Sequence, residues 1–174
     1  MNRALPAGVD PRIRVVEGTD IDAIISLVRA LAIYEKAEHE ALMTADQLRT
    51  ALFADNAAVY GLVASETPSG EVVGFALYFL NFSTWRGVHG IYLEDLFVEE
   101  AHRGTGLGKA LLQTLAKIAD ARSYARMEWS VLRWNEPSIK FYESIGAFAM
   151  GEWDMMRLAD EALTNFAHDV RAPA

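Results

Sequence analysis

The chain has 174 residues, of which 52% are hydrophobic and 23% charged, with a formal net charge of −8 and no cysteine. A chain of this length buries roughly 70% of its extended surface on folding, which is enough for one well-cored domain without cross-links. The composition excludes disulfides, thiolate zinc sites and a cysteine nucleophile. The negative charge disfavours nucleic acid as a partner and favours a cationic one.

Other global features predict a cytoplasmic protein without a metal centre. No apolar run approaches the roughly 20 residues of a membrane span, and the N-terminus lacks the layout of a secretion signal. The four histidines are scattered along the chain, so we expect no metal site. Residues 1–11 contain two prolines and a glycine and are expected to form a flexible leader before a single domain over residues 12–174.

The chain alternates between strand and helix patterns. β-Branched and aromatic runs predict strands, and apolar stripes at helical spacing predict helices. In chain order, the expected elements are a strand at 12–16, helices at 21–32 and 44–53, strands at 59–64, 71–82 and 91–98, a helix at 107–122, a strand at 127–132, a helix at 136–145, a strand at 153–158 and a helix at 160–170. The strand-helix-strand units of the second half imply some parallel pairing within one mixed α/β domain.

Helix caps and one turn support these boundaries. Thr19 or Asp20 can cap the first helix, and Thr44 with Gln47 fits a capping box. Gly146 is a plausible left-handed C-cap, and Asp160 can cap the last helix. The run Thr67-Pro68-Ser69-Gly70 is typical of a turn between two strands.

The segment Arg103–Lys109 (Arg-Gly-Thr-Gly-Leu-Gly-Lys) lies between a predicted strand and a long predicted helix. Its glycines let backbone amides approach a ligand, and the helix N-terminus adds partial positive charge, which together suit a pyrophosphate. It is not a Walker A loop, because Arg103 replaces the first glycine and Ala110 the magnesium-binding hydroxyl. It is not a dinucleotide fingerprint either, because the glycines fall at 104, 106 and 108. The remaining pattern, Arg-x-x-Gly-x-Gly after a strand, resembles the coenzyme A loop of the GNAT acetyltransferases, and the alternative is a glycine-rich turn that binds no ligand.

A second group of polar residues opens the helix predicted at 136–145. Asn135 is a good N-cap, and Pro137 fits the first turn of the helix. Asn135, Ser138 and Tyr142 are three and four residues apart and therefore line one helical face. Such a face suits a polar cofactor tail and a reacting thiol, or simply belongs to a capped helix with a packed tyrosine.

In this order, Ile91–Val98, Arg103–Lys109 and Trp134–Tyr142 resemble the spermidine/spermine N-acetyltransferase branch of the GNAT superfamily. The resemblance extends from Arg12 through the C-terminal helix and includes Leu31–Glu35 and Val73–Phe79. It implies an α/β GNAT fold, in which a twisted mixed sheet is flanked by helices. Two parallel strands at its centre splay to admit acetyl-CoA. Close relatives resemble homodimers, so a homodimer is expected.

The resemblance also implies the residues of the site. Backbone groups of Leu96, Phe97 and Val98 would bind the pantetheine arm of acetyl-CoA. The pyrophosphate would lie on the loop formed by Arg103, Gly104, Thr105, Gly106, Leu107, Gly108 and Lys109. Asn135, Glu136, Pro137 and Ser138 would contact the cofactor further along. Tyr142 matches the family's proton donor, Glu94 matches the acid beside the amine, and Tyr34, Glu35, Glu128, Trp129 and Ser130 match positions on the acceptor side.

The chemistry of thioester aminolysis assigns roles to two of these residues. A substrate ammonium with a pKa near ~10 is mostly charged at neutral pH, so a base must remove its proton. Glu94 is the candidate, directly or through a water molecule, although it can also be read as a solvated strand residue. Tyr142 can donate a proton to the departing thiolate, and strand amides near Leu96 can stabilise the developing oxyanion.

The acceptor is expected to be a small cationic amine, namely a diamine, a polyamine or a thialysine- or lysine-like compound. Glu35, Glu94, Asp95 and Glu152, with Trp85 and Trp153, could form an acidic, aromatic-walled pocket, although Glu35 and Glu152 could equally be ordinary surface acids. Polyamine-acting relatives carry Asp-Pro before the tryptophan, whereas this chain has Ser83-Thr84, which resembles the thialysine-type relatives. Alternatives are a non-catalytic acetyl-CoA sensor and an acetyltransferase for protein N-termini or aminoglycosides.

Overall fold

The computed structural model describes residues 4–168, which divide between Ser130 and Val131 into two compact units. The first unit contains the whole β-sheet and the helices that cover it, and the second contains α4 and α5.

The sheet of the first unit is mixed, as the resemblance implies. Its strands are β1 (Ile13–Val15), β2 (Val59–Ser65), β3 (Val72–Ser83), β4 (Val88–Val98) and β5 (Met127–Trp129), hydrogen-bonded in the order β1-β2-β3-β4-β5. The first three pairings are antiparallel, and β4 pairs with β5 in parallel. Five of the six predicted strands are therefore confirmed, with β5 shorter than expected.

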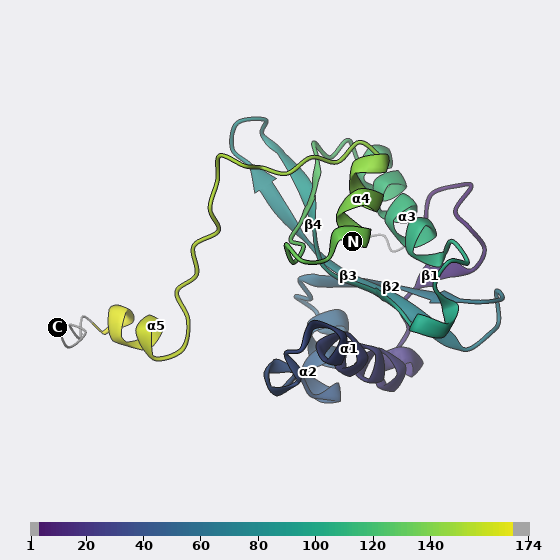
Figure 1. The fold of residues 1–174 in the computed structure, drawn as a ribbon, viewed down its shortest axis with the longest axis horizontal. Coiled ribbons are helices and arrows are strands. Elements are labelled where there is room, and N and C mark those ends of the chain that lie inside the picture. Colours follow the sequence, from purple (N-terminus) through teal and green to yellow (C-terminus); the bar gives the residue numbers. More distant parts are fainter. Residues whose placement is uncertain (1–3, 169–174) are drawn as a thin grey trace. The chain divides into compact units, whose positions relative to one another are not determined.

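Helices cover both faces of this sheet (Figure 1). They are η1 (Gly18–Asp20), α1 (Ile21–Glu35), η2 (Glu38–Glu40), α2 (Ala45–Phe53), η3 (Glu100–His102) and α3 (Leu107–Ala121). Helices α1 and α2 lie on one face, where Ile24, Leu48 and Phe75 belong to one buried cluster, and α3 lies on the other (Figure 1). Burying apolar surface on both faces stabilises the central strands, which are the ones that carry the site.

Local capping chemistry explains where α2 begins but not where α1 begins. The Thr44 hydroxyl accepts a bond from the Gln47 amide at 3.3 Å and the Gln47 side chain accepts one from the Thr44 amide at 2.9 Å, which confirms the capping box of α2. Asp20 stands at the N-cap of α1, but its side chain does not cap the helix. Asp20 is 5% exposed, and its carboxylate accepts two bonds of 2.7 Å from Arg14. The predicted capping residue therefore forms an ion pair instead of capping the helix.

The second unit contains α4 (Glu136–Ser144) and α5 (Asp160–Ala167). Gly146 has a φ of +88° and donates to the Glu143 carbonyl at 3.0 Å, which confirms the left-handed C-cap of α4. The strand predicted at 153–158 is wrong, because these residues form neither strand nor helix. An alternating apolar pattern forms a strand only where another strand offers its edge.

The cap predicted for α5 is also wrong. Ala159 occupies the N-cap position, and Asp160 is the first helical residue with a φ of +52°. The predicted end near Val170 lies outside the described residues.

Candidate active site

A one-residue bulge in β4 places two carboxylates side by side. Opposite β3, Asp95 pairs with Leu77 and Leu93 pairs with Tyr78, so Glu94 is an extra residue without a partner. A bulge of this kind interrupts the alternation of side chains, so the side chains of Glu94 and Asp95 point to the same face of the sheet as that of Leu77. Because Leu77 belongs to the cluster under α1 and α2, Glu94 and Asp95 are directed to the α1 face.

The two carboxylates differ in their surroundings. Glu94 is exposed, whereas Asp95 is largely shielded from water. Burial, followed by the charges of Glu94 and of Glu35 at the end of α1, raises the pKa of Asp95 to about 6. Burial also raises the pKa of Glu35. The first unit thus brings Asp95 within the electrostatic influence of two other predicted acids, Glu94 and Glu35.

The edge of β4 beyond the bulge is open on the β5 side. Parallel pairing runs from Ile91 opposite Met127 to Leu93 opposite Trp129 and ends there, within the part of the chain described. A bond of 3.0 Å from the Glu99 amide to the Val73 carbonyl shows which residues of β4 direct their backbone groups toward β3 in the antiparallel ladder. The alternation of that ladder directs the backbone groups of Phe97 to β3 and those of Leu96 and Val98 to the open edge. Of the three predicted pantetheine-binding residues, only these two present backbone groups there.

The glycine loop joins η3 to α3 and offers unpaired amides. Gly104 and Gly106 have φ values of +79° and +85°, a backbone region that L side chains rarely adopt. Among residues 4–168, no backbone N–H from Gly104 to Lys109 donates to an acceptor of the chain. Unpaired amides at a helix N-terminus fit an anion, so the loop has the donor set that the diphosphate of coenzyme A requires.

Arg103 does not extend from this loop into solvent. Its Nε donates to the Val98 carbonyl at 3.1 Å. Its guanidinium carbon lies 4.7 Å from the ring centre of Tyr34 and 5.4 Å from that of Phe97. Both distances are within the range of cation–π attraction. Arg103 therefore ties the loop to β4 and to the end of α1, and Tyr34, predicted on the acceptor side, is part of this contact.

The remaining acceptor-side residues of the first unit lie further along the sheet. Glu128 on β5 already accepts bonds from Asn81 at 2.5 Å and Arg126 at 2.8 Å. The Ser130 hydroxyl lies 3.0 Å from that of Tyr92. Trp85 is 90% exposed in the turn between β3 and β4. The Glu128 carboxylate is thus partly neutralised, which leaves the three acids near the bulge as the stronger cation site.

The second unit carries the other predicted site residues. The Asn135 side chain accepts a bond from the Ser138 amide at 3.4 Å, which caps α4, with Pro137 in the first turn as predicted. Burial raises the pKa of the Tyr142 phenol, so it stays protonated at neutral pH. Glu152 and Trp153 are exposed in the segment between α4 and α5.

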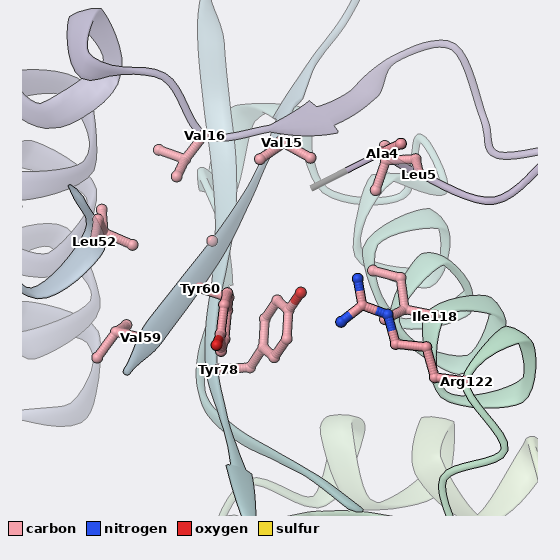
Figure 2. Close-up of a pocket in the computed structure, with 11 residues that line it drawn as sticks. Ala4, Leu5, Val15, Val16, Leu52, Val59, Tyr60, Tyr78, Ile118 and Arg122 are labelled. Carbon is pink, nitrogen blue, oxygen red and sulfur yellow. The ribbon is translucent and has the colours of Figure 1, made fainter. Parts of the chain in front are cut away.

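None of the predicted site residues lines the pocket shown in Figure 2. It lies in the first unit between the start of the chain, β1–β3 and the end of α3, with the rings of Tyr60 and Tyr78 facing Arg122 (Figure 2). Its volume of about 20 Å³ admits little more than a water molecule. This pocket is therefore not the candidate site, which consists of the open edge of β4 and the glycine loop.

Among residues 4–168, no three His, Asp or Glu residues are grouped as a metal site would require. No described helix combines the length and the apolar character needed to cross a membrane.

A strand that loses its parallel neighbour beside a bulge, followed by a glycine loop at a helix N-terminus, fits the mixed sheet and cofactor loop that the resemblance implies. The model of the acetyltransferase (GNAT) family matches residues 26–147, and the chain belongs to this family. It is a GNAT N-acetyltransferase, and membership of the family implies acetyl-CoA as the co-substrate.

Individual relatives agree with the family match. The chain is 33% identical to thialysine N-epsilon-acetyltransferase of Mus musculus, over 90% of this chain and 96% of that protein. It is 30% identical to L-ornithine N5-acetyltransferase NATA1 of Arabidopsis thaliana, over 87% and 86%. Among solved structures, an integron cassette protein from the V. cholerae mobile metagenome aligns with a TM-score of 0.73 and 28% identity over 89% of this chain and 96% of that one.

Replacement of Asp95 by Asn should stabilise the protein at neutral pH but not in acid. The raised folded-state pKa means that the folded chain holds this proton more tightly than the unfolded chain, so stability is lost as pH rises from about 4 through about 6. A shift of about two pKa units corresponds to roughly 3 kcal/mol. Urea unfolding should therefore show Asp95→Asn more stable than the wild type by about 2–3 kcal/mol at pH 7.5 and equal to it near pH 4.

The exposed Asp55→Asn serves as the control and should show no such difference between the two pH values. A gain for Asp95→Asn that is the same at both pH values would contradict a cost due to buried charge.

Proposed function

We propose that this enzyme transfers an acetyl group from acetyl-CoA directly to a primary amine of a small cationic acceptor, of the thialysine, ornithine or diamine type. The observation that carries the proposal is the arrangement of Glu35, Glu94 and Asp95 beside an open β4 edge that leads into unpaired loop amides. Carboxylates near one another attract an alkylammonium ion. The names of the relatives support the acceptor class, since thialysine and ornithine both carry an amine on a short alkyl chain.

The chain's own groups would hold acetyl-CoA in two places. The backbone groups of Leu96 and Val98 at the open edge can pair with the amide groups of the pantetheine arm, as an added strand would. The Val98 carbonyl already accepts from Arg103, so the Leu96 groups and the Val98 amide remain available for this role. The amides from Gly104 to Lys109 would take the diphosphate, and Asn135–Ser138 would contact the cofactor further along.

The proposed reaction needs three proton movements. Acetyl-CoA supplies the acetyl group as an activated thioester. Glu94, directly or through a water molecule, accepts one proton of the acceptor ammonium, so that the neutral nitrogen forms the new C–N bond, and Glu94 later passes that proton to solvent. Tyr142 donates its phenol proton to the sulfur as the C–S bond breaks. The second proton of the amine leaves the new amide nitrogen and returns to the Tyr142 phenolate through solvent. Support for this role comes from the burial of Tyr142, which keeps the phenol protonated at neutral pH.

A thiol-release assay with acetyl-CoA tests the proposal. Thialysine, ornithine, diamines, polyamines, a peptide N-terminus and an aminoglycoside should be compared, with release expected for the short alkylamines. Tyr142→Phe should lower turnover by about 10²-fold or more with little change in acetyl-CoA affinity, because only a proton donor is removed. Tyr60→Phe, outside the site, should keep wild-type rates.

Binding of acetyl-CoA without amine-dependent release would instead indicate a sensor. Acceptance of only the peptide or the aminoglycoside would overturn the acceptor class.

A pH profile tests the base. Glu94→Gln should depress the rate most at low pH, where little free amine is present, and by about 10²-fold or more if the carboxylate acts as general base. Glu71→Gln is the charge-matched control, because Glu71 is exposed and lies just before β3. If the profile of Glu94→Gln keeps its wild-type shape while that of Asp95→Asn changes, Asp95 is the base.

We further propose that the enzyme is a homodimer in which the C-terminal segment is covered. Its large apolar side chains are exposed, with Phe166 79% and Met156 89% accessible. Other exposed members are Phe148, Met150, Trp153, Met155 and Leu163. A run of exposed apolar residues of this kind is typical of an interaction surface.

Sedimentation velocity tests the homodimer. The wild type should sediment as a species of twice the 19.3 kDa chain at micromolar concentration. Met156→Ser combined with Phe166→Ser should weaken the dimer at least tenfold, because each change removes buried apolar area. Leu42→Ser, equally exposed at 80% but in the first unit, is the control. A monomeric wild type would contradict the proposal.

A further inference from the structure

The backbone of the glycine loop accepts a hydrogen bond from a residue far away in the sequence. Arg12, directly before β1, donates from Nη1 to the Thr105 carbonyl at 3.2 Å. Its Nη2 lies 4.0 Å from the position that a Cβ on Gly106 would occupy, so the guanidinium stands against the loop at the N-cap of α3. No feature of the sequence pattern indicates this contact, because the two residues are 93 positions apart.

Arg12 is itself fixed in place by Asp10. The carboxylate of Asp10 accepts bonds from Nε at 3.0 Å and from Nη2 at 2.8 Å, a fork-to-fork arrangement that fixes the plane of the guanidinium. Asp10 also accepts a bond from the Arg12 amide at 3.0 Å. Both side chains are about one quarter exposed. The hydrogen bonds from Arg12 lower the pKa of Asp10, so the pair stays ionised through the neutral range.

The geometry of the peptide bond carries this restraint to the ligand side of the loop. In a planar trans peptide the carbonyl and the following N–H point in opposite directions. With the Thr105 carbonyl turned toward Arg12, the Gly106 N–H must point away from it. That amide is one of the unpaired donors of the loop. Gly106, with a φ of +85°, lacks the side chain that would otherwise restrict its rotation.

We propose that Arg12, held by Asp10, is a positioning residue that fixes the Thr105–Gly106 peptide so that the Gly106 amide faces the diphosphate of acetyl-CoA. This inference rests on the proposed function. Arg12 acts through the loop backbone, and its charge is offset by Asp10. Without it, the Thr105–Gly106 peptide gains rotational freedom that binding must then remove, which weakens affinity by about tenfold.

Calorimetry of acetyl-CoA binding tests the proposal. Arg12→Ala should raise the Kd for acetyl-CoA about tenfold, and Arg12→Lys, which keeps a donor but not the fork, should fall between it and the wild type. The kcat/KM with S-acetylpantetheine, which lacks the diphosphate, should stay within twofold. Arg49→Ala is the matched control, because Arg49 donates to the Gly18 carbonyl at 3.3 Å away from the loop and should leave the Kd unchanged.

Asp10→Ala separates positioning from simple charge attraction. If Arg12 only attracted the diphosphate as a cation, removing the Asp10 charge would tighten binding, which would overturn the proposal. If Arg12 positions the peptide, Asp10→Ala should weaken binding several-fold. Order parameters of the Gly106 amide, measured by NMR without ligand, should fall in both Arg12→Ala and Asp10→Ala.

The remaining outcomes are also decisive. An unchanged Kd in Arg12→Ala, or equal losses with acetyl-CoA and S-acetylpantetheine, would overturn this inference while the proposed function stands. Failure of the wild type to bind acetyl-CoA would overturn the proposed function and this inference together.

Discussion

Strand β4 has a hydrogen-bonded neighbour on one edge along most of its length, but its neighbour on the other edge ends at Trp129. We attribute the end of the β4–β5 pairing to the bulge at Glu94, because an extra residue changes the pleat and increases the twist of the strand. A parallel strand whose hydrogen-bonding groups pair with those of β4 up to Leu93 is no longer in register with β4 beyond that residue. Unpaired backbone groups in the middle of a sheet require another partner, and an extended amide-bearing ligand is one that fits.

The same bulge determines the electrostatics of the site. In a regular strand Glu94 and Asp95 would face opposite sides of the sheet. The bulge turns both toward α1, where Glu35 adds a third carboxylate. Holding three like charges together lowers the stability of the free protein, and a bound ammonium ion would relieve part of that cost. The proposed cation site therefore depends on the single extra residue in the ladder between β3 and β4.

Much of the fold follows from local sequence signals, whereas the details of the site depend on pairing. The capping box at Thr44 and the C-cap at Gly146 involve contacts within a few residues and were predictable from them. The bulge at Glu94 was not, since it is defined by the register with β3. The strand predicted at 153–158 failed for a related reason, because a strand requires a partner edge that the pattern alone cannot supply. The sequence motifs predict which segments form the candidate site, and that assignment stays a prediction, whereas the burial of Asp95 becomes visible only in the structure.

The glycine loop has a flexible sequence, but side chains from other parts of the first unit restrain its backbone. Glycines allow the required φ values but also increase the freedom of the chain, so the loop needs restraints from elsewhere. Three side chains provide such restraints by donating hydrogen bonds to backbone carbonyls. Arg12 donates to the Thr105 carbonyl and the Thr105 hydroxyl donates to the His102 carbonyl. Arg103 donates to the Val98 carbonyl. A carbonyl dipole that faced a diphosphate would repel it, so turning carbonyls toward cations and hydroxyls both removes repulsion and exposes the opposite amides. In the proposed site, the amides that would face the diphosphate are therefore oriented by side chains that need not touch it.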